Sequence, residues 1–174
     1  MSDMNDISCT IYWDKLNENA KVPTKRREDA GLDIYTIDDG VILKPLETKM
    51  FNTGLKSAFS KDFWIEIKER GSTGTIGLSV RSGVIDSGYR GEWKIVLTNV
   101  NNFPVEFSSK VKEVTRVYYK WPFNKRIKKI IYPTRKAIAQ AVVIPLPLVY
   151  NSPWSEREIQ VSERGEGGWG ASGK

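Results

Sequence analysis

Short runs that alternate between apolar and polar residues, with turn residues between them, most constrain the fold of this chain. In DFWIEIK (62–68) every second residue is apolar, and WKIVLTNV (93–100) sets one apolar face against Lys94, Val96 and Thr98. The repeated apolar positions are Phe63, Ile65 and Ile67 in the first run and Trp93, Ile95 and Leu97 in the second. A period of two is that of half-buried strands. Turn signals such as Asp39-Gly40 separate many such runs, which predicts an all-β sandwich or barrel.

Composition narrows the chemistry that such a fold can carry. With 174 residues, 40% of them hydrophobic, the chain is expected to be one globular unit with its own core. It has no histidine and a single cysteine, Cys9, which excludes imidazole catalysis, cysteine-cluster metal sites and an intrachain disulfide. Catalysis must therefore use carboxylates, hydroxyls, backbone amides or a cation bound by oxygen.

The N-terminal region predicts where the protein works. It begins MSDMNDISCTIYWDK, which lacks the basic and apolar regions of a leader, and no apolar run reaches the length of a membrane span. We therefore expect a cytoplasmic protein, of a bacterial or phage-infected cell, without membrane contact.

Positive charge is concentrated in one segment. The net charge is +6, but residues 110–136 hold ten Lys or Arg against one acid, Glu113, so this segment is +9 and the remainder is −3. Val111, Val114 and Tyr118 have helical spacing, whereas EVTRVYY (113–119) is rich in β-branched and aromatic residues. We favour an extended hairpin with WPFNK (121–125) as its tip.

Three glycine-rich stretches have the composition of anion sites. ERGSTGTIG (69–77) and RGEGGWG (164–170) combine an arginine with small residues whose amides can approach a phosphate, and GVIDSGYRGEW (83–93) adds an acid and a tyrosine. Neither of the first two is a Walker loop. The last eleven residues contain five glycines and are predicted to form a mobile arm.

Taken in order, five stretches resemble the motifs of the trimeric dUTPase family. They are DAGLDIY (29–35), ERGSTG (69–74), GVIDSGYRGE (83–92), KAIAQAVV (136–143) and RGEGGWGASGK (164–174). The resemblance implies a jelly-roll-like β domain over residues 1–162, a C-terminal arm over 163–174 that closes the active site, and a homotrimer with shared sites. The implied reaction is hydrolysis of dUTP to dUMP and pyrophosphate with Mg²⁺, which limits uracil in DNA and supplies dUMP for dTTP synthesis.

The resemblance also implies roles for individual residues. Asp86 is the expected catalytic acid that activates water for attack on the α-phosphate, and Asp33 is expected to bind Mg²⁺ through water. The sugar and base are assigned to Gly83, Ile85, Tyr89 and Trp169. The phosphates are assigned to Arg70, Gly71, Ser72, Gln140, Arg164, Gly168 and Gly170. From the residues alone, three structural roles stay open as the less favoured alternatives: Asp33 as a turn residue, Tyr89 as a core residue and Gln140 as a strand-packing residue.

The chain departs from the family pattern at several positions. Gly71 stands where a serine is usual, so either Ser72 or a backbone amide must bind in its place. Ala137 stands where an arginine usually opens the fourth motif, with Arg135 and Lys136 as candidate substitutes, and Trp169 replaces the usual phenylalanine. A basic aromatic insertion at about 106–132 is left open as a structural elaboration, a protein-binding surface or a nucleic-acid-binding surface.

Two other functions are possible for a chain with these motifs. A dCTP deaminase shares this fold but needs a glutamate base where this chain has Val96, so we disfavour it. A regulatory binding protein of dUTPase fold would use the basic insertion to contact a protein or nucleic acid.

Overall fold

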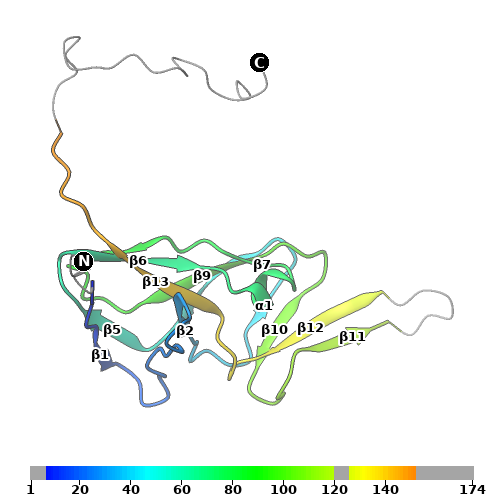
Figure 1. The fold of residues 1–174 in the computed structure, drawn as a ribbon. Helices are drawn as coiled ribbons and strands as arrows, with labels where there is room; N and C mark the ends of the chain where they lie inside the picture. The colour runs from blue at the N-terminus through cyan, green and yellow to red at the C-terminus, as the bar shows by residue number, and fades with distance from the viewer. Residues whose placement is uncertain (1–6, 120–125, 152–174) are drawn as a thin grey trace, which may run out of the picture.

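The protein is nearly all β in its computed structural model, which describes residues 7–119 and 126–151 (Figure 1). The single helix in this part of the chain is α1 (Gly71–Gly74). It is too short to cross a membrane. The strands are β1 (Tyr12–Lys15), β2 (Gly31–Ile34), β3 (Ile42–Leu43), β4 (Thr48–Asn52), β5 (Leu55–Ala58), β6 (Phe63–Lys68), β7 (Leu78–Val80), β8 (Val84–Ile85), β9 (Lys94–Asn99), β10 (Val105–Ser108), β11 (Thr115–Tyr118), β12 (Ile127–Pro133) and β13 (Ala139–Pro145). The predicted fold class is confirmed.

The strands form four small sheets that enclose one core. Their orders are β2-β13-β6-β8, β4-β9-β7, β11-β12-β10-β3 and β1-β5, and all pairs are antiparallel except β10 with β12. Ile65 on β6 and Ile95 on β9 are completely buried. The ring of Phe107 on β10 lies 4.5 Å from that of Phe51 and 5.6 Å from that of Tyr132, so all the larger sheets contribute to this core.

The predicted alternation holds in β6 and in most of β9. Thr98 is the exception, because it was assigned to the polar face but is only 9% exposed. Strand β9 lies between β4 and β7, so this residue is covered from both sides. Its hydroxyl is hydrogen-bonded to the Thr48 hydroxyl at 2.8 Å and accepts from Arg81 Nε at 3.3 Å.

The basic segment forms the predicted hairpin rather than a helix. Strands β11 and β12 pair antiparallel and project from the other three sheets (Figure 1). The proposed tip, 121–125, lies outside the described residues. Both ends of the insertion at about 106–132 are nevertheless part of the domain, because Phe107, Ile130 and Tyr132 all belong to the core. The parallel pairing of β12 with β10 places them there.

Candidate active site

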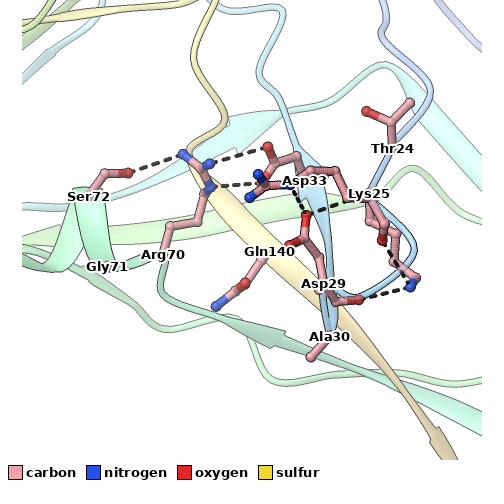
Figure 2. Close-up of a pocket in the computed structure, with 11 residues that line it drawn as sticks. Thr24, Lys25, Asp29, Ala30, Asp33, Arg70, Gly71, Ser72 and Gln140 are labelled. Atoms are coloured by element: carbon pink, nitrogen blue, oxygen red, sulfur yellow. Dashed lines mark hydrogen bonds and ion pairs between the residues drawn. The ribbon is translucent and has the colours of Figure 1, made fainter.

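The first cleft, of about 690 Å³, brings together the described residues assigned to phosphate and metal (Figure 2). Strand β13 pairs with both β2 and β6, and its Gln140 stands opposite Asp33 on one side and Lys68 on the other. The loop after β6 then supplies Arg70, Gly71 and Ser72. Three stretches that are far apart in the sequence therefore meet at one end of this sheet.

Arg70 is held by several groups in this cleft. Its Nε and Nη2 face the two carboxylate oxygens of Asp33, at 2.8 Å and 3.2 Å, in a bidentate ion pair. Its Nη1 donates to Ser72 Oγ at 3.1 Å and to the Ala137 carbonyl at 3.4 Å. Asp33 is therefore more than a turn residue, since it is the charge partner of the arginine assigned to phosphate.

The loop after β6 separates the roles of its two hydroxyls. Residues 71–74 form one helical turn rather than an open loop, and Thr73 within it is completely buried. The Thr73 hydroxyl donates to the Arg70 carbonyl at 3.0 Å and accepts from the Arg70 amide at 3.2 Å. Ser72 is exposed and lines the cleft, so its hydroxyl is the one placed for a ligand.

Gln140 has a structural contact of its own. Its Nε2 donates to the Glu69 carbonyl at 2.7 Å, at the start of the loop that carries Arg70. A Cβ at Gly31 would come within 2.5 Å of Gln140 Oε1, so the DAG sequence needs its glycine to admit this side chain. Gln140 supports the cleft, and its role as a phosphate ligand remains a prediction.

A second cleft, of about 320 Å³, contains the described residues assigned to the nucleoside and to catalysis. Gly83, Ile85, Asp86 and Tyr89 line it together. Tyr89 is 43% exposed and is therefore not a core residue. Its phenol donates to the Glu92 carbonyl at 3.0 Å, and its amide donates to the Asp86 carbonyl at 3.0 Å, which closes a tight turn between the acid and the ring.

The glycines around this turn differ in what they permit. A Cβ built at Gly83 or Gly88 would meet nothing within 4 Å, and neither residue has a positive φ. The fold itself therefore does not require glycine there, whereas a ligand approaching the backbone would. At Gly91, by contrast, a Cβ would lie 2.6 Å from Tyr89 Cζ. Glycine at this position makes room for the Tyr89 ring.

Several lining residues were not assigned from the sequence. The second cleft includes Met50 and Lys94, which come from the paired strands β4 and β9 and carry no motif signal. The first includes Lys25 and Arg26, from a KRR run that precedes the first motif. The KRR run was the sequence signal that could have identified these two residues, because basic residues beside a predicted phosphate site often contribute to it. Lys25 Nζ donates to the Asp29 carbonyl at 2.8 Å and so closes this loop on itself.

The candidate substitutes for the missing arginine of the fourth motif lie elsewhere. Arg135 and Lys136 both form ion pairs with Glu113, at 3.0 Å and 2.5 Å, and neither lines the first cleft. Ala137 itself is buried. Arg164, Gly168, Trp169 and Gly170, which were assigned to the C-terminal arm, lie outside the described residues.

The donor set of the first cleft suits a hydrated cation. Over residues 7–119 and 126–151, no group of three or more His, Cys, Asp or Glu side chains is placed to hold a metal ion. Asp33 offers one carboxylate beside Ser72 and Arg70, which bind phosphate oxygens well. Mg²⁺ keeps several waters and binds through one or two carboxylates together with substrate phosphates, so these residues fit that ion.

Comparisons with known proteins point to one family. A family model described as dUTPase matches residues 18–116. The deoxyuridine 5'-triphosphate nucleotidohydrolase of Nautilia profundicola is 36% identical over 166 residues, covering 92% of this chain and 96% of the relative. That of Clostridium novyi is 31% identical over 169 residues, covering 94% and 98%. The dUTPase of Staphylococcus bacteriophage 80alpha, solved with dUPNHPP, superposes with a TM-score of 0.68 at 25% identity, covering 95% of this chain and 99% of the phage protein.

These matches extend over both clefts and nearly the full length of the curated relatives. The motif order, the β fold and the family model all lead to the same conclusion. This chain belongs to the dUTPase family.

Proposed function

We propose that this chain is a dUTP diphosphatase that hydrolyses dUTP to dUMP and pyrophosphate, with Mg²⁺, and so limits uracil in DNA and supplies dUMP for dTTP synthesis. The observation that carries the proposal is the second cleft, where the exposed carboxylate of Asp86 lies beside Tyr89 and the unobstructed backbone of Gly83. Family membership and the names of the relatives support the same activity.

The second cleft would select the nucleoside. Tyr89, which lines this cleft, would offer the flat side of its ring to the deoxyribose. The ring would then leave no room for a 2′-hydroxyl and would exclude ribonucleotides. Gly83 and Ile85 would bring main-chain groups to the edge of uracil. Trp169 of the C-terminal arm would stack on the base from the other side.

Asp86 would carry the chemical step. Its carboxylate orients a water molecule and accepts its proton as the oxygen attacks the α-phosphorus. The bond from this phosphorus to the bridging oxygen of the β-phosphate breaks, and pyrophosphate leaves. An exposed carboxylate suffices, because phosphoryl transfer depends on positioning and charge neutralisation more than on a strong base.

The first cleft would hold the triphosphate. The negative phosphates would draw Arg70 away from Asp33, and the freed Asp33 carboxylate would accept hydrogen bonds from waters on Mg²⁺. The cation, when bound, neutralises charge on the phosphate oxygens. The Gly71 amide, Ser72 and Gln140 would add donors from the same cleft. Arg164, Gly168 and Gly170, from the arm at 163–174, would close over the phosphates and exclude bulk water.

We also propose a homotrimer with shared sites, and the separation of the two clefts supports a site completed by a second copy. Among the described residues the two clefts share no lining residue, although one dUTP must contact both the phosphate-binding and the nucleoside-binding residues. Leu148, Val149 and Tyr150, just after β13, are 85%, 73% and 85% exposed. Contiguous exposed apolar side chains are typical of a protein–protein contact. A second copy that brings its second cleft to the first cleft of this chain would complete the site.

The test is hydrolysis of dUTP, UTP, dTTP and dCTP by the purified protein, with pyrophosphate and ammonia both measured. Pyrophosphate from dUTP alone is expected. Asp86→Asn should lower kcat by about 10²–10⁴-fold while the Kd for dUPNHPP stays within about threefold. Asp14→Asn, an exposed carboxylate on β1 outside both clefts, is the matched control. Ammonia from dCTP, or no hydrolysis of any nucleotide, would refute the proposal.

Two features bear on the alternative functions. Val96 lies in the second cleft beside Asp86, so the position where a deaminase needs its glutamate holds an apolar side chain. The hairpin presents Arg116, Arg126 and Lys128 to solvent, and among the described residues none of them has an ion-pair partner. We propose binding of a protein partner at this hairpin as a secondary role, to be tested by charge-removing substitutions there. We also propose that the protein works in the cytoplasm.

A further inference from the structure

The phenol of Tyr132 reaches the arginine of the first cleft through one carbonyl group. Tyr132 Oη donates to the Ala137 carbonyl at 2.7 Å, and Arg70 Nη1 donates to the same oxygen at 3.4 Å. Nη1 also donates to Ser72 Oγ at 3.1 Å. The Ala137 carbonyl therefore connects a core tyrosine to the guanidinium assigned to phosphate.

Tyr132 has little freedom of its own. It is completely buried on β12, and its ring lies 5.6 Å from that of Phe107, its register partner on β10. Burial raises the pKa of Tyr132, against the opposing effect of the nearby Arg70 cation, so the phenol remains a protonated donor at neutral pH. A buried hydroxyl needs an acceptor, and the Ala137 carbonyl provides it.

The turn that carries this carbonyl is held from its other side as well. The Lys136 amide donates to the Pro133 carbonyl at 3.0 Å, and Arg135 Nε donates to the Lys112 carbonyl at 2.8 Å. Both basic side chains also pair with Glu113, just before β11. The segment between the third and fourth motifs thus fixes the turn at two points, one of them in the core.

The contacts of Arg70 divide into two sets. Nε and Nη2 face Asp33, whose carboxylate must release them when phosphate arrives. Nη1 faces Ser72 and Ala137, which carry no charge and can stay in place. A fixed acceptor at Nη1 would keep the guanidinium plane oriented while its other edge changes partners, which limits the conformational entropy lost on binding.

We propose that Tyr132 is a positioning residue that holds Arg70 in the orientation for triphosphate binding, through the carbonyl of Ala137. The inference rests on the proposed function, since it takes the triphosphate to be the ligand of Arg70. It gives the hairpin segment a role in the active site. The position at which the fourth motif usually carries an arginine then contributes through its main chain.

The test compares the triphosphate with the monophosphate. In Tyr132→Phe the ring still fills the core, but the Ala137 carbonyl loses its shorter hydrogen bond. The affinity for dUPNHPP with Mg²⁺ should fall about 2- to 10-fold, the range for one lost hydrogen bond. The affinity for dUMP should change less, because dUMP lacks the β- and γ-phosphates. A variant that is merely less stable would not separate the two ligands.

Two further variants make the result decisive. Tyr118→Phe, the same change at an exposed tyrosine on β11, should leave both affinities unaltered. In an Arg70→Lys background, Tyr132→Phe should cause no further loss, because the two residues act as a unit. Equal losses for both ligands, or additive losses with Arg70→Lys, would overturn the inference alone. A wild-type protein that binds dUPNHPP no better than dUMP would overturn the proposed function and this inference together.

Discussion

Substitution of Gly91 by alanine tests whether the placement of Tyr89 determines sugar selection. The backbone of Gly91 has an ordinary φ, so alanine causes no strain of its own. Its Cβ would, however, lie 2.6 Å from Tyr89 Cζ and 2.9 Å from Cε2, where real Cβ contacts begin at 3.0 Å. The neighbouring phenol must therefore move and release the Glu92 carbonyl, which it now contacts at 3.0 Å.

The effect on stability should be small, because two changes oppose each other. Losing one partly exposed hydrogen bond costs about 0.5–1.5 kcal/mol. Replacing glycine by alanine at a compatible φ returns about 0.4–1 kcal/mol by restricting the unfolded chain. The net change in the free energy of unfolding should stay within about 1 kcal/mol. Displacement of a positioning group by about 1 Å can cost ~100-fold in rate, so kcat/KM for dUTP should fall by about 10- to 100-fold.

The assay is kcat/KM for dUTP and for UTP, with thermal unfolding of the same samples. We expect the ratio of dUTP to UTP to fall, because the displaced ring no longer fills the space of a 2′-hydroxyl. Tyr89→Phe, which keeps the ring and removes the hydroxyl, should retain most of the selectivity. Gly74→Ala, where a Cβ meets nothing within 4 Å, calibrates the stability change. An unchanged ratio in Gly91→Ala, despite a displaced ring, would show that Tyr89 does not select the sugar.

Two further predictions concern the core and its acid stability. Phe107→Ala should lower the free energy of unfolding by about 3–5 kcal/mol, whereas Tyr118→Ala should stay within about 1 kcal/mol, as measured by urea at fixed protein concentration. Asp39 accepts hydrogen bonds from the Ser109 hydroxyl (2.7 Å) and amide (2.6 Å), which lower its pKa. This stabilisation is complete above the unfolded value of about 3.9 and is lost as pH falls through the lowered folded pKa; Asp39→Asn should flatten the acid limb of the unfolding curve.

The sequence predicted the elements of the fold better than their partners. Period-two patterns identified β6 and β9, and β-branched residues identified β11 against a helical alternative. Which strands pair is decided by long-range packing, which local periodicity does not encode. The parallel pairing of β10 with β12 is an example, since nothing in the sequence of either strand predicts its partner. The burial of Thr98 likewise depends on the strands on either side of β9.

The candidate site shows the same division. Motif resemblance assigned Asp33 to Mg²⁺ and Arg70 and Gln140 to phosphate. The structure brings all three into one cleft. The ion pair between Asp33 and Arg70 was not predicted, because it forms only when β13 aligns the ends of β2 and β6. Tyr132 was missed for a related reason. A tyrosine in a strand is most simply interpreted as a core residue. Its hydrogen bond to the Ala137 carbonyl forms only because the turn after β12 folds back towards it.

The parallel pair of β10 and β12 has a consequence for folding kinetics. Parallel neighbours need a long connection, and the entropy of closing it is lost before their contacts form. Here β11 pairs with β12 locally and brings Ile130 back towards Val105. Local contacts form faster than distant ones, so the basic hairpin should close first and β10 should join it afterwards. The segment with the highest charge thereby sets the order in which part of the core is assembled.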